Sequence, residues 1–191
     1  MQQVEIIAIG VSAGGMKALA TLLAYLPVDY GIPVIIVQHL LEGSDSFLAE
    51  YLNDQVSIHI QEAVDKESLQ SGIVYLAPPG YHLLVEDDCT LSLSIDPKVN
   101  YSRPSIDVLF DSVAFVYQER CLGVILTGAN QDGSVGLRSI KENGGMAIVQ
   151  RPETAEYPAM PLAALATVEV DHIMSLDEIG EFLTTLQHQA R

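Results

Sequence analysis

Residues 7–23 read IAIGVSAGGMKALATLL and join an apolar run, a glycine-rich turn and a helical pattern. The apolar run covers 4–9 and predicts a buried strand, whereas apolar residues at helical spacing over 14–26 predict a helix. Ser12 lies in the turn between them, flanked by Gly10 and Gly14. Such a turn serves either through its backbone, as a loop that cradles phosphate, or through the serine hydroxyl, as a nucleophile.

The alternation of strands and helices continues along the chain. Continuous apolar strands alternating with helices are typical of a parallel sheet covered on both faces. Further helical patterns cover 46–53, 104–119, 133–142 and 175–187, and Pro104 is expected in the first turn of its helix. Apolar runs predict strands over 33–37, 56–60, 73–76, 121–126, 146–150 and 168–173.

One region breaks this pattern. The runs 81–85 and 90–95 flank an acidic turn at 86–88, and the second run alternates between apolar and polar residues. This pattern predicts a β-hairpin at one edge of the sheet. We therefore predict a single α/β domain over residues 1–191, with a doubly wound, mostly parallel sheet, helices on both faces and a hairpin excursion near 81–95.

The composition narrows the class of protein. The chain has 191 residues, of which 49% are hydrophobic, and no apolar stretch approaches the roughly 20 residues that span a bilayer. The N-terminus lacks the features of a signal peptide. Cys89 and Cys121 are the only cysteines, so there is neither a disulfide framework nor a metal-ligand spacing. These features predict a cytoplasmic protein without a metal.

The charge is strongly acidic, at −16 from 25 acidic and 9 basic residues. An acidic surface repels nucleic-acid backbones and anionic lipid, which argues against nucleic-acid binding and membrane insertion. No basic residue occurs between Lys17 and Lys66, nor between Arg151 and Arg191. Two interpretations remain open: a solvated face that maintains solubility, and a face that steers a basic partner.

Polar residues follow three of the predicted strands. Ser12 follows the first strand, His39 the second, and Asp132 lies in the loop after the strand at 121–126. In open parallel sheets, functional residues gather beyond the carboxyl ends of the strands. A serine needs a base to become a good nucleophile, an imidazole suits that task, and a carboxylate orients the imidazole. The three residues together predict an acyl-transfer site.

Each of these residues also has a structural interpretation. A glycine-rich first turn is more often a phosphate or dinucleotide loop, although Ser12 replaces the middle glycine of G-x-G-x-x-G and no P-loop lysine follows. His39 could be a packed or surface histidine, and Asp132 could form a turn or cap a helix. Other candidates for the base are His59, His82, His172 and His188.

Six segments, spread over nearly the whole chain, carry a family resemblance: IAIGVSAGG (7–15), VIIVQHL (34–40), VYLAPPGYHLLV (74–85), RPSIDVLFDSVA (103–114), GVILTGANQDGSVGL (123–137) and AMPLAAL (159–165). In this order they resemble the catalytic domain of the chemotaxis protein-glutamate methylesterases of the CheB type. This resemblance implies that Ser12 is the nucleophile, His39 the general base and acid, and Asp132 the orienting carboxylate, with no cofactor. It further implies hydrolysis of γ-glutamyl methyl esters on the cytoplasmic helices of methylated chemoreceptors, and in many members deamidation of receptor glutamines.

The loop at 127–133 departs from the family's usual T-G-M-G-x-D-G. Ala129 stands in place of the methionine, whose main-chain N–H contributes to the family's oxyanion hole, and Asn130 replaces a glycine. Asparagine tolerates a positive φ better than most residues. Ala13 follows the serine where many members carry a hydroxyl residue. These changes bear on efficiency and substrate choice more than on the three candidate catalytic residues.

Two further residues are candidates for substrate contact. Arg103 lies in a segment that resembles a family motif near the active-site cleft. It could contact an acidic receptor helix, or it could pair with a surface carboxylate at the start of a helix. Met160 is expected to pack near the site rather than take part in chemistry.

Two other functions stay open. The changed loop, and the absence of the receiver domain that typical members carry before the catalytic domain, leave room for a weak or inactive CheB-like regulatory module. A Rossmann-type nucleotide-binding enzyme is disfavoured by the glycine pattern. The sequence does not indicate an oligomeric state.

Overall fold

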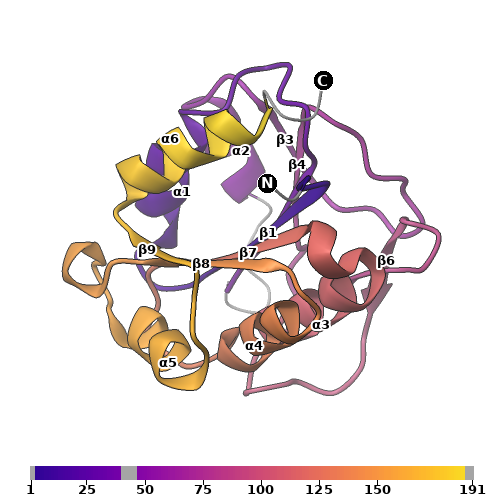
Figure 1. The fold of residues 1–191 in the computed structure, drawn as a ribbon. Coiled ribbons are helices and arrows are strands. Elements are labelled where there is room, and N and C mark those ends of the chain that lie inside the picture. Colours follow the sequence, from indigo (N-terminus) through magenta and orange to yellow (C-terminus); the bar gives the residue numbers. More distant parts are fainter. Residues whose placement is uncertain (1–2, 40–46, 188–191) are drawn as a thin grey trace.

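The computed structural model describes residues 3–39 and 47–187 (Figure 1). Within these residues, seven strands form one sheet in the order β3-β4-β2-β1-β7-β8-β9, and each neighbouring pair is parallel. The mostly parallel sheet predicted from the apolar runs is confirmed. The strands are β1 (Ile6–Val11), β2 (Val34–Gln38), β3 (His59–Glu62), β4 (Ile73–Leu76), β7 (Cys121–Ile125), β8 (Met146–Gln150) and β9 (His172–Met174).

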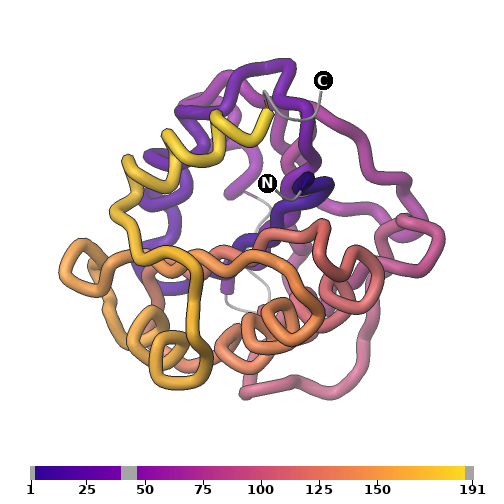
Figure 2. The backbone as a smooth tube through the Cα atoms, in the orientation of Figure 1, coloured from indigo at the N-terminus to yellow at the C-terminus, as the bar shows by residue number. Residues whose placement is uncertain are grey.

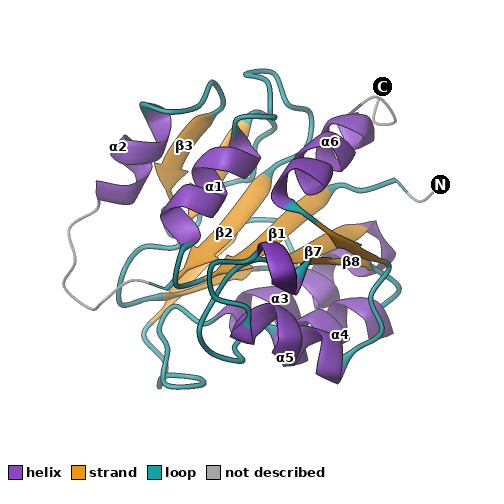
Figure 3. Cartoon of the chain, turned by 90° about the vertical axis from the view of Figure 1, so that its left-hand side faces the viewer, coloured by secondary structure: helices purple, strands orange, loops and turns teal. Residues whose placement is uncertain are grey.

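Helices cover both faces of the sheet, as Figures 1 and 3 show. One face packs against α1 (Gly15–Leu23), α2 (Phe47–Asn53) and α6 (Leu176–Gln187). The other face packs against α3 (Ile106–Tyr117), α4 (Ser134–Glu142) and α5 (Ala159–Thr167). Short 3-10 turns lie at η1 (Gln118–Arg120) and η2 (Pro152–Thr154). No described helix has the length and apolar character needed to cross a bilayer.

Burial on both faces explains the continuous apolar strands. Along β1, Ile7 and Ile9 pack with the first set of helices, whereas Ile6 and Ala8 pack with the second. All four side chains are fully buried. A strand with two buried faces has no polar side, so its sequence does not alternate.

The order of the strands places a topological switch point at β1. From β1 the chain builds one side of the sheet through β2, β3 and β4, and then crosses to the other side through β7, β8 and β9, a path that can be followed in Figure 2. Gly10 pairs with Val37 of β2 and with Ile125 of β7. The carboxyl ends of these three strands therefore lie side by side, which is where open α/β sheets bind their ligands.

The predicted hairpin forms a small sheet of its own. β5 (His82–Val85) and β6 (Leu91–Ser94) pair antiparallel and do not extend the large sheet. Leu83, Val85 and Leu91 are buried in the same core as α3. The apolar side of the hairpin thus covers the helical layer rather than an edge strand.

Several boundaries differ from the predicted ones. Helix α3 begins at Ile106 with Ser105 as its N-cap, so Pro104 precedes the helix instead of occupying its first turn. The predicted strand at 56–60 is displaced to 59–62, because Val56 and Ile58 contribute apolar surface from a loop. Helix α5 was not predicted, and the first residue of the predicted helix 46–53 lies outside the described residues.

Candidate active site

Ser12 lies one residue beyond β1, in a turn that leads directly into α1. Its N–H donates to the carbonyl of Thr127 (3.0 Å), and its own carbonyl accepts from the N–H of Gly15 (2.9 Å). Gly14, the N-cap of α1, has φ +79°, a conformation that favours glycine. A Cβ on Gly15 would collide with the side-chain amide of Gln38. These glycines let the turn close tightly, with Ser12 at the N-terminal end of a helix.

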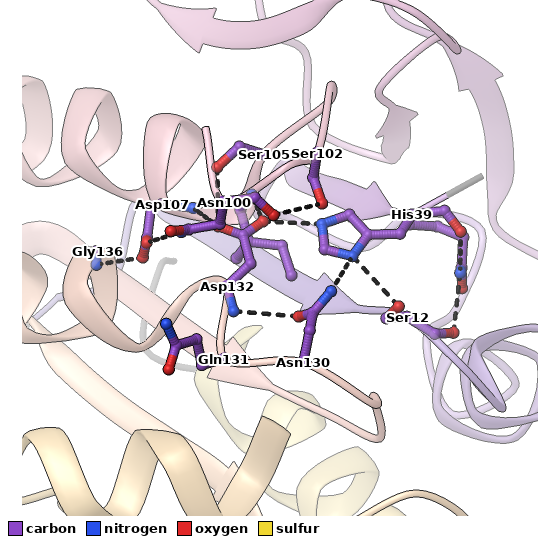
Figure 4. A network of polar contacts seen from close by, with 12 residues as sticks. Ser12, His39, Asn100, Ser102, Ser105, Asp107, Asn130, Gln131, Asp132 and Gly136 are labelled. Carbon is purple, nitrogen blue, oxygen red and sulfur yellow. Dashed lines mark hydrogen bonds and ion pairs between the residues drawn. The ribbon is translucent and has the colours of Figure 1, made fainter. Parts of the chain in front are cut away.

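Ser12, His39 and Asp132 form a continuous series of hydrogen-bonding contacts (Figure 4). His39 Nδ1 lies 3.2 Å from Ser12 Oγ, and His39 Nε2 lies 2.8 Å from Asp132 Oδ2. An ionised carboxylate can only accept, so Nε2 carries the proton, and Nδ1 of a neutral ring then offers its lone pair to the serine. The structure thus brings the three predicted residues together from the ends of three adjacent strands.

Gln38 joins the two turns that carry the serine and the histidine. Its Nε2 donates to the main-chain carbonyls of Ser12 and of His39, both at 2.9 Å. The residue is 6% exposed. Sequence reasoning did not single out Gln38. The available signal was a polar residue ending the apolar strand VIIVQ, directly before the histidine.

Asp132 is fully buried and surrounded by donors. Its Oδ1 accepts from Asn100 Nδ2 (2.9 Å), Ser105 Oγ (2.8 Å) and the N–H of Asp107 (3.3 Å). Its Oδ2 accepts from the N–H of Ile106 (2.7 Å) in addition to His39. Two of these donors are main-chain amides in the first turn of α3, where the helix dipole favours a negative charge.

These donors decide the ionisation of Asp132. Burial alone raises the pKa of a carboxyl group, but the hydrogen bonds from His39, Asn100 and the Ile106 amide outweigh that effect and hold the pKa of Asp132 below its usual value. Asp132 is therefore an anion at neutral pH, as an orienting carboxylate must be.

A second buried carboxylate, Asp107, lies behind Asp132. Asn100 donates through Nδ2 to Asp107 Oδ2 (2.7 Å) as well as to Asp132, and the N–H of Gly136 donates to Asp107 Oδ1 (2.7 Å). Burial raises the pKa of Asp107, the Gly136 amide opposes this, and the negative charge of Asp132 raises the pKa further. Asn100 was not a predicted site residue. It is placed by a turn in which Asn100 and Tyr101 both have positive φ.

The loop after β7 is fastened to the serine turn. Thr127 Oγ1 donates to the carbonyl of Ala13 (2.9 Å), and the N–H of Thr127 donates to Gln150 Oε1 (2.8 Å). Within residues 3–39 and 47–187, the main-chain N–H groups of Ala13 and Ala129 donate to no protein acceptor. Both remain available for an oxygen atom brought by a ligand.

Asn130 contacts two of the predicted residues. Its Nδ2 lies 3.2 Å from Nδ1 of His39, and its Oδ1 accepts the N–H of Asp132 at 3.1 Å. Among the described residues with positive φ, Asn130 does not appear. The position therefore makes no use of glycine-like backbone freedom, and its side chain instead reaches the imidazole.

A cavity of about 640 Å³ opens beside the serine and is the natural place for a substrate. Arg103 and Met160 do not line it. Arg103 donates through Nη1 to the carbonyls of Ile95 (2.8 Å) and Asp96 (3.1 Å). Met160 is buried and packs against Gly128, beneath the site loop. The cavity is lined by Ser12, Ala13, Gly14, Gly15, Met16, Lys17, Gln38, His39 and Glu156.

The other described histidines make no hydrogen bond to Ser12. His82 is buried, with Nδ1 accepting the N–H of Ser105 (3.2 Å), and His172 packs its ring against Phe182. His59 is exposed on β3, and His188 lies outside the described residues. No cluster of three or more His, Cys, Asp or Glu side chains able to hold a metal occurs in the part of the chain that the structure describes.

An α/β sheet that carries a serine, a histidine and a carboxylate in hydrogen-bonding series at its switch point is the arrangement of a serine hydrolase. The family model of the CheB methylesterases matches residues 7–183. The catalytic domain of Thermotoga maritima CheB methylesterase superimposes with a TM-score of 0.92 at 31% identity, covering 96% of this chain and 99% of that one. The chain belongs to the CheB methylesterase family.

Relatives of known designation agree with this assignment. A protein-glutamate methylesterase/protein-glutamine glutaminase from Geobacillus kaustophilus is 42% identical over 96% of this chain and 54% of its own length. One from Clostridium acetobutylicum is 36% identical over 93% of this chain and 52% of its own length. The chain thus spans about half the length of these two relatives. A Leptospira interrogans protein, provisionally given the same designation, is 52% identical over 95% of this chain and 94% of its own.

Proposed function

We propose that this chain hydrolyses methyl esters of γ-glutamyl side chains on the cytoplasmic helices of chemoreceptors, with Ser12, His39 and Asp132 as its catalytic triad. The observation that carries the proposal is the series of contacts Ser12–His39–Asp132, at 3.2 and 2.8 Å, at the switch point of a CheB-family fold. The designations of the relatives supply the reactive groups, protein glutamines and methyl esters of protein glutamates. The chemoreceptor follows from the resemblance to the CheB family.

The first half of the reaction forms an acyl-enzyme. Ser12 Oγ attacks the ester carbonyl carbon while its proton passes to Nδ1 of His39, and the anionic Asp132 stabilises the resulting imidazolium through Nε2–H. The carbonyl oxygen becomes an oxyanion, for which the N–H groups of Ala13 and Ala129 are the proposed donors. Collapse of the intermediate expels the methoxy group, which takes the proton from Nδ1 and leaves as methanol.

The second half frees the glutamyl side chain of the substrate as a carboxylate. A water molecule attacks the glutamyl ester of Ser12, giving one proton to His39, and the serine oxygen recovers that proton as the acyl bond breaks. We propose the same steps for glutamine side chains, where the amide NH₂ group takes the proton from Nδ1 and leaves as ammonia. These steps call for no cofactor or metal.

Methanol release from a methylated cytoplasmic fragment of a chemoreceptor tests the proposal. We expect release by the unaltered chain and none above background with Ser12→Ala. Ser139→Ala is the matched control, because Ser139 lies on α4 and its hydroxyl contacts only the carbonyl of Val135 within the described residues. Loss in Ser12→Ala alone supports the proposal, whereas equal release from Ser12→Ala would contradict it. No release from the unaltered chain would favour the regulatory module.

A further inference from the structure

Two hydrogen-bond donors face the same nitrogen of His39. Ser12 Oγ and Asn130 Nδ2 each lie 3.2 Å from Nδ1, as the dashed lines in Figure 4 show. A ring nitrogen that carries no proton has one lone pair. Both contacts are long for hydrogen bonds of their kind. The serine therefore shares its base with an amide.

The orientation of the Asn130 amide follows from its other contact. The N–H of Asp132 can only donate, and it lies 3.1 Å from Oδ1 of Asn130. The oxygen of the amide must therefore face Asp132, which turns the NH₂ group toward His39. The reverse orientation would set an NH₂ group against the Asp132 N–H and an oxygen against the lone pair of Nδ1.

This contact opposes the step in which His39 acts as a base. When Nδ1 takes the serine proton, it becomes an N–H group, and an N–H group cannot accept from the Asn130 amide. The amide must then turn away, and it has room to do so because Asn130 is exposed at the rim of the site. On the opposite side of the ring, Asp132 is buried and keeps its hold on Nε2 throughout.

We propose that Asn130 is a positioning residue that restrains the site at rest: its amide occupies Nδ1 of His39, and bound substrate displaces it, so that Ser12 becomes fully activated only in the complex. This inference rests on the proposed function, since it assumes that Ser12 is the nucleophile. It means that the loop at 127–133, through Asn130, limits the reactivity of Ser12 until substrate binds.

A small alkyl fluorophosphonate tests the restraint without a receptor. Ser12 Oγ bonds to phosphorus, fluoride leaves, and the serine proton passes to His39, so the labelling rate reports the activation of the serine. We expect Asn130→Ala and Asn130→Leu to label about three to ten times faster than the unaltered chain, the effect of one ordinary hydrogen bond. Asn130→Leu keeps the size of the side chain but removes both its donor to His39 and its acceptor for the Asp132 N–H. The matched control is Gln131→Ala, which removes an exposed amide from the same loop.

The receptor substrate supplies the second readout. Bound substrate displaces the amide in the unaltered chain, so the Asn130 variants should gain less in turnover than in labelling. The factor by which kcat for methanol release rises should be at most one third of the factor by which the labelling rate rises. A general disturbance of the loop would instead change both rates alike and alter KM. Circular dichroism and thermal melting establish that each variant is folded.

The outcomes separate the two proposals. Labelling that is unchanged or slower in both Asn130 variants, or equally fast in Gln131→Ala, would overturn the restraint and leave the proposed function intact. Absence of labelling at Ser12 in every chain, the unaltered one included, would refute the nucleophile on which both proposals depend. Faster labelling confined to the Asn130 variants supports the restraint.

Discussion

The two sides of the His39 ring differ in how firmly they are held. On the Nε2 side, Asp132 is fully buried and receives five hydrogen bonds, three of them at 2.8 Å or less. On the Nδ1 side, Ser12 and Asn130 share one lone pair at 3.2 Å, next to an open cavity. The comparison shows that hydrogen bonds fix the position of Asp132 before any ligand arrives, whereas Ser12 is held less tightly and can respond to a ligand.

Removing the charge on the firmly held side should have the largest effect. Asp132→Asn keeps the size of the side chain but presents an NH₂ group to donors, so we expect kcat for methanol release to fall about 10³- to 10⁴-fold. The free energy of unfolding at pH 7 should fall by about 3 kcal/mol, because the buried donors around position 132 would lose their charged acceptor. Steady-state kinetics and urea unfolding measure both, and a loss of kcat under tenfold would contradict this account.

The stability effect of Asp132 should depend on pH in a defined direction. Its pKa is lower in the folded chain than the ordinary value of 3.8, so its stabilising contribution is fully present above that value and is lost as the pH falls through the folded pKa. The difference in unfolding free energy between the unaltered chain and Asp132→Asn should therefore be constant from pH 7 to about pH 5 and shrink below pH 4. If this difference in unfolding free energy instead grew as the pH fell, folding would raise the pKa of Asp132, and the prediction would be wrong.

Loosening the link between the turns that carry Ser12 and His39 should have an intermediate effect. Gln38→Leu removes the donors to the carbonyls of Ser12 and His39 while keeping a side chain of similar volume. A small displacement of a nucleophile is costly, so we expect kcat to fall about tenfold, with a smaller change in KM. Val37→Leu is the matched control on the same strand. Equal kcat values for Gln38→Leu and the unaltered chain would show that the strand ends hold the serine without this link.

The smallest effect should come from replacing Asn100, which donates to the Asp132 oxygen away from His39. Asn100→Ala removes a donor shared by Asp132 and Asp107, and we expect a loss of about 2 kcal/mol in unfolding free energy and a few-fold loss in kcat. The neighbouring Tyr101 is 98% exposed, so Tyr101→Ala should change stability by less than about 0.5 kcal/mol. Chemical denaturation of the two variants side by side distinguishes the contact from a general effect on the turn.

Much of the fold was predictable because the sheet is buried on both faces. The strand at 146–150 was predicted with its observed bounds, and the strand at 121–126 differs by one residue, since continuous apolar runs mark such strands clearly. Helix α5 was not predicted because its sequence, AMPLAALAT, is almost entirely apolar and shows no alternation of polar and apolar residues at helical spacing. The predicted start of α3 differs from the observed one because the sequence pattern places Pro104 in the first turn, whereas the helix begins at Ile106 with Ser105 as its N-cap.

The site also contains residues that the sequence predicts and residues that it does not. Ser12, His39 and Asp132 could be named in advance because each follows a strand whose place in the sheet brings the loops together. The contacts of Gln38, Asn100 and Asn130 could not be predicted, since each depends on a side-chain direction or a loop conformation. The replacement of a glycine by Asn130 predicts an effect on the backbone, whereas in the structure the Asn130 side chain contacts the imidazole of His39.

The amides at the start of α3 give Asp132 a second task, and with it a different evolutionary constraint. Ser105 makes no side-chain capping bond, and Asp132, distant in sequence, accepts the first free N–H groups of the helix instead. A lineage released from selection for hydrolysis would lose Ser12 at little cost to folding, whereas loss of Asp132 would also uncap α3. Descendants that have ceased to hydrolyse esters are therefore expected to retain the aspartate long after the serine has drifted.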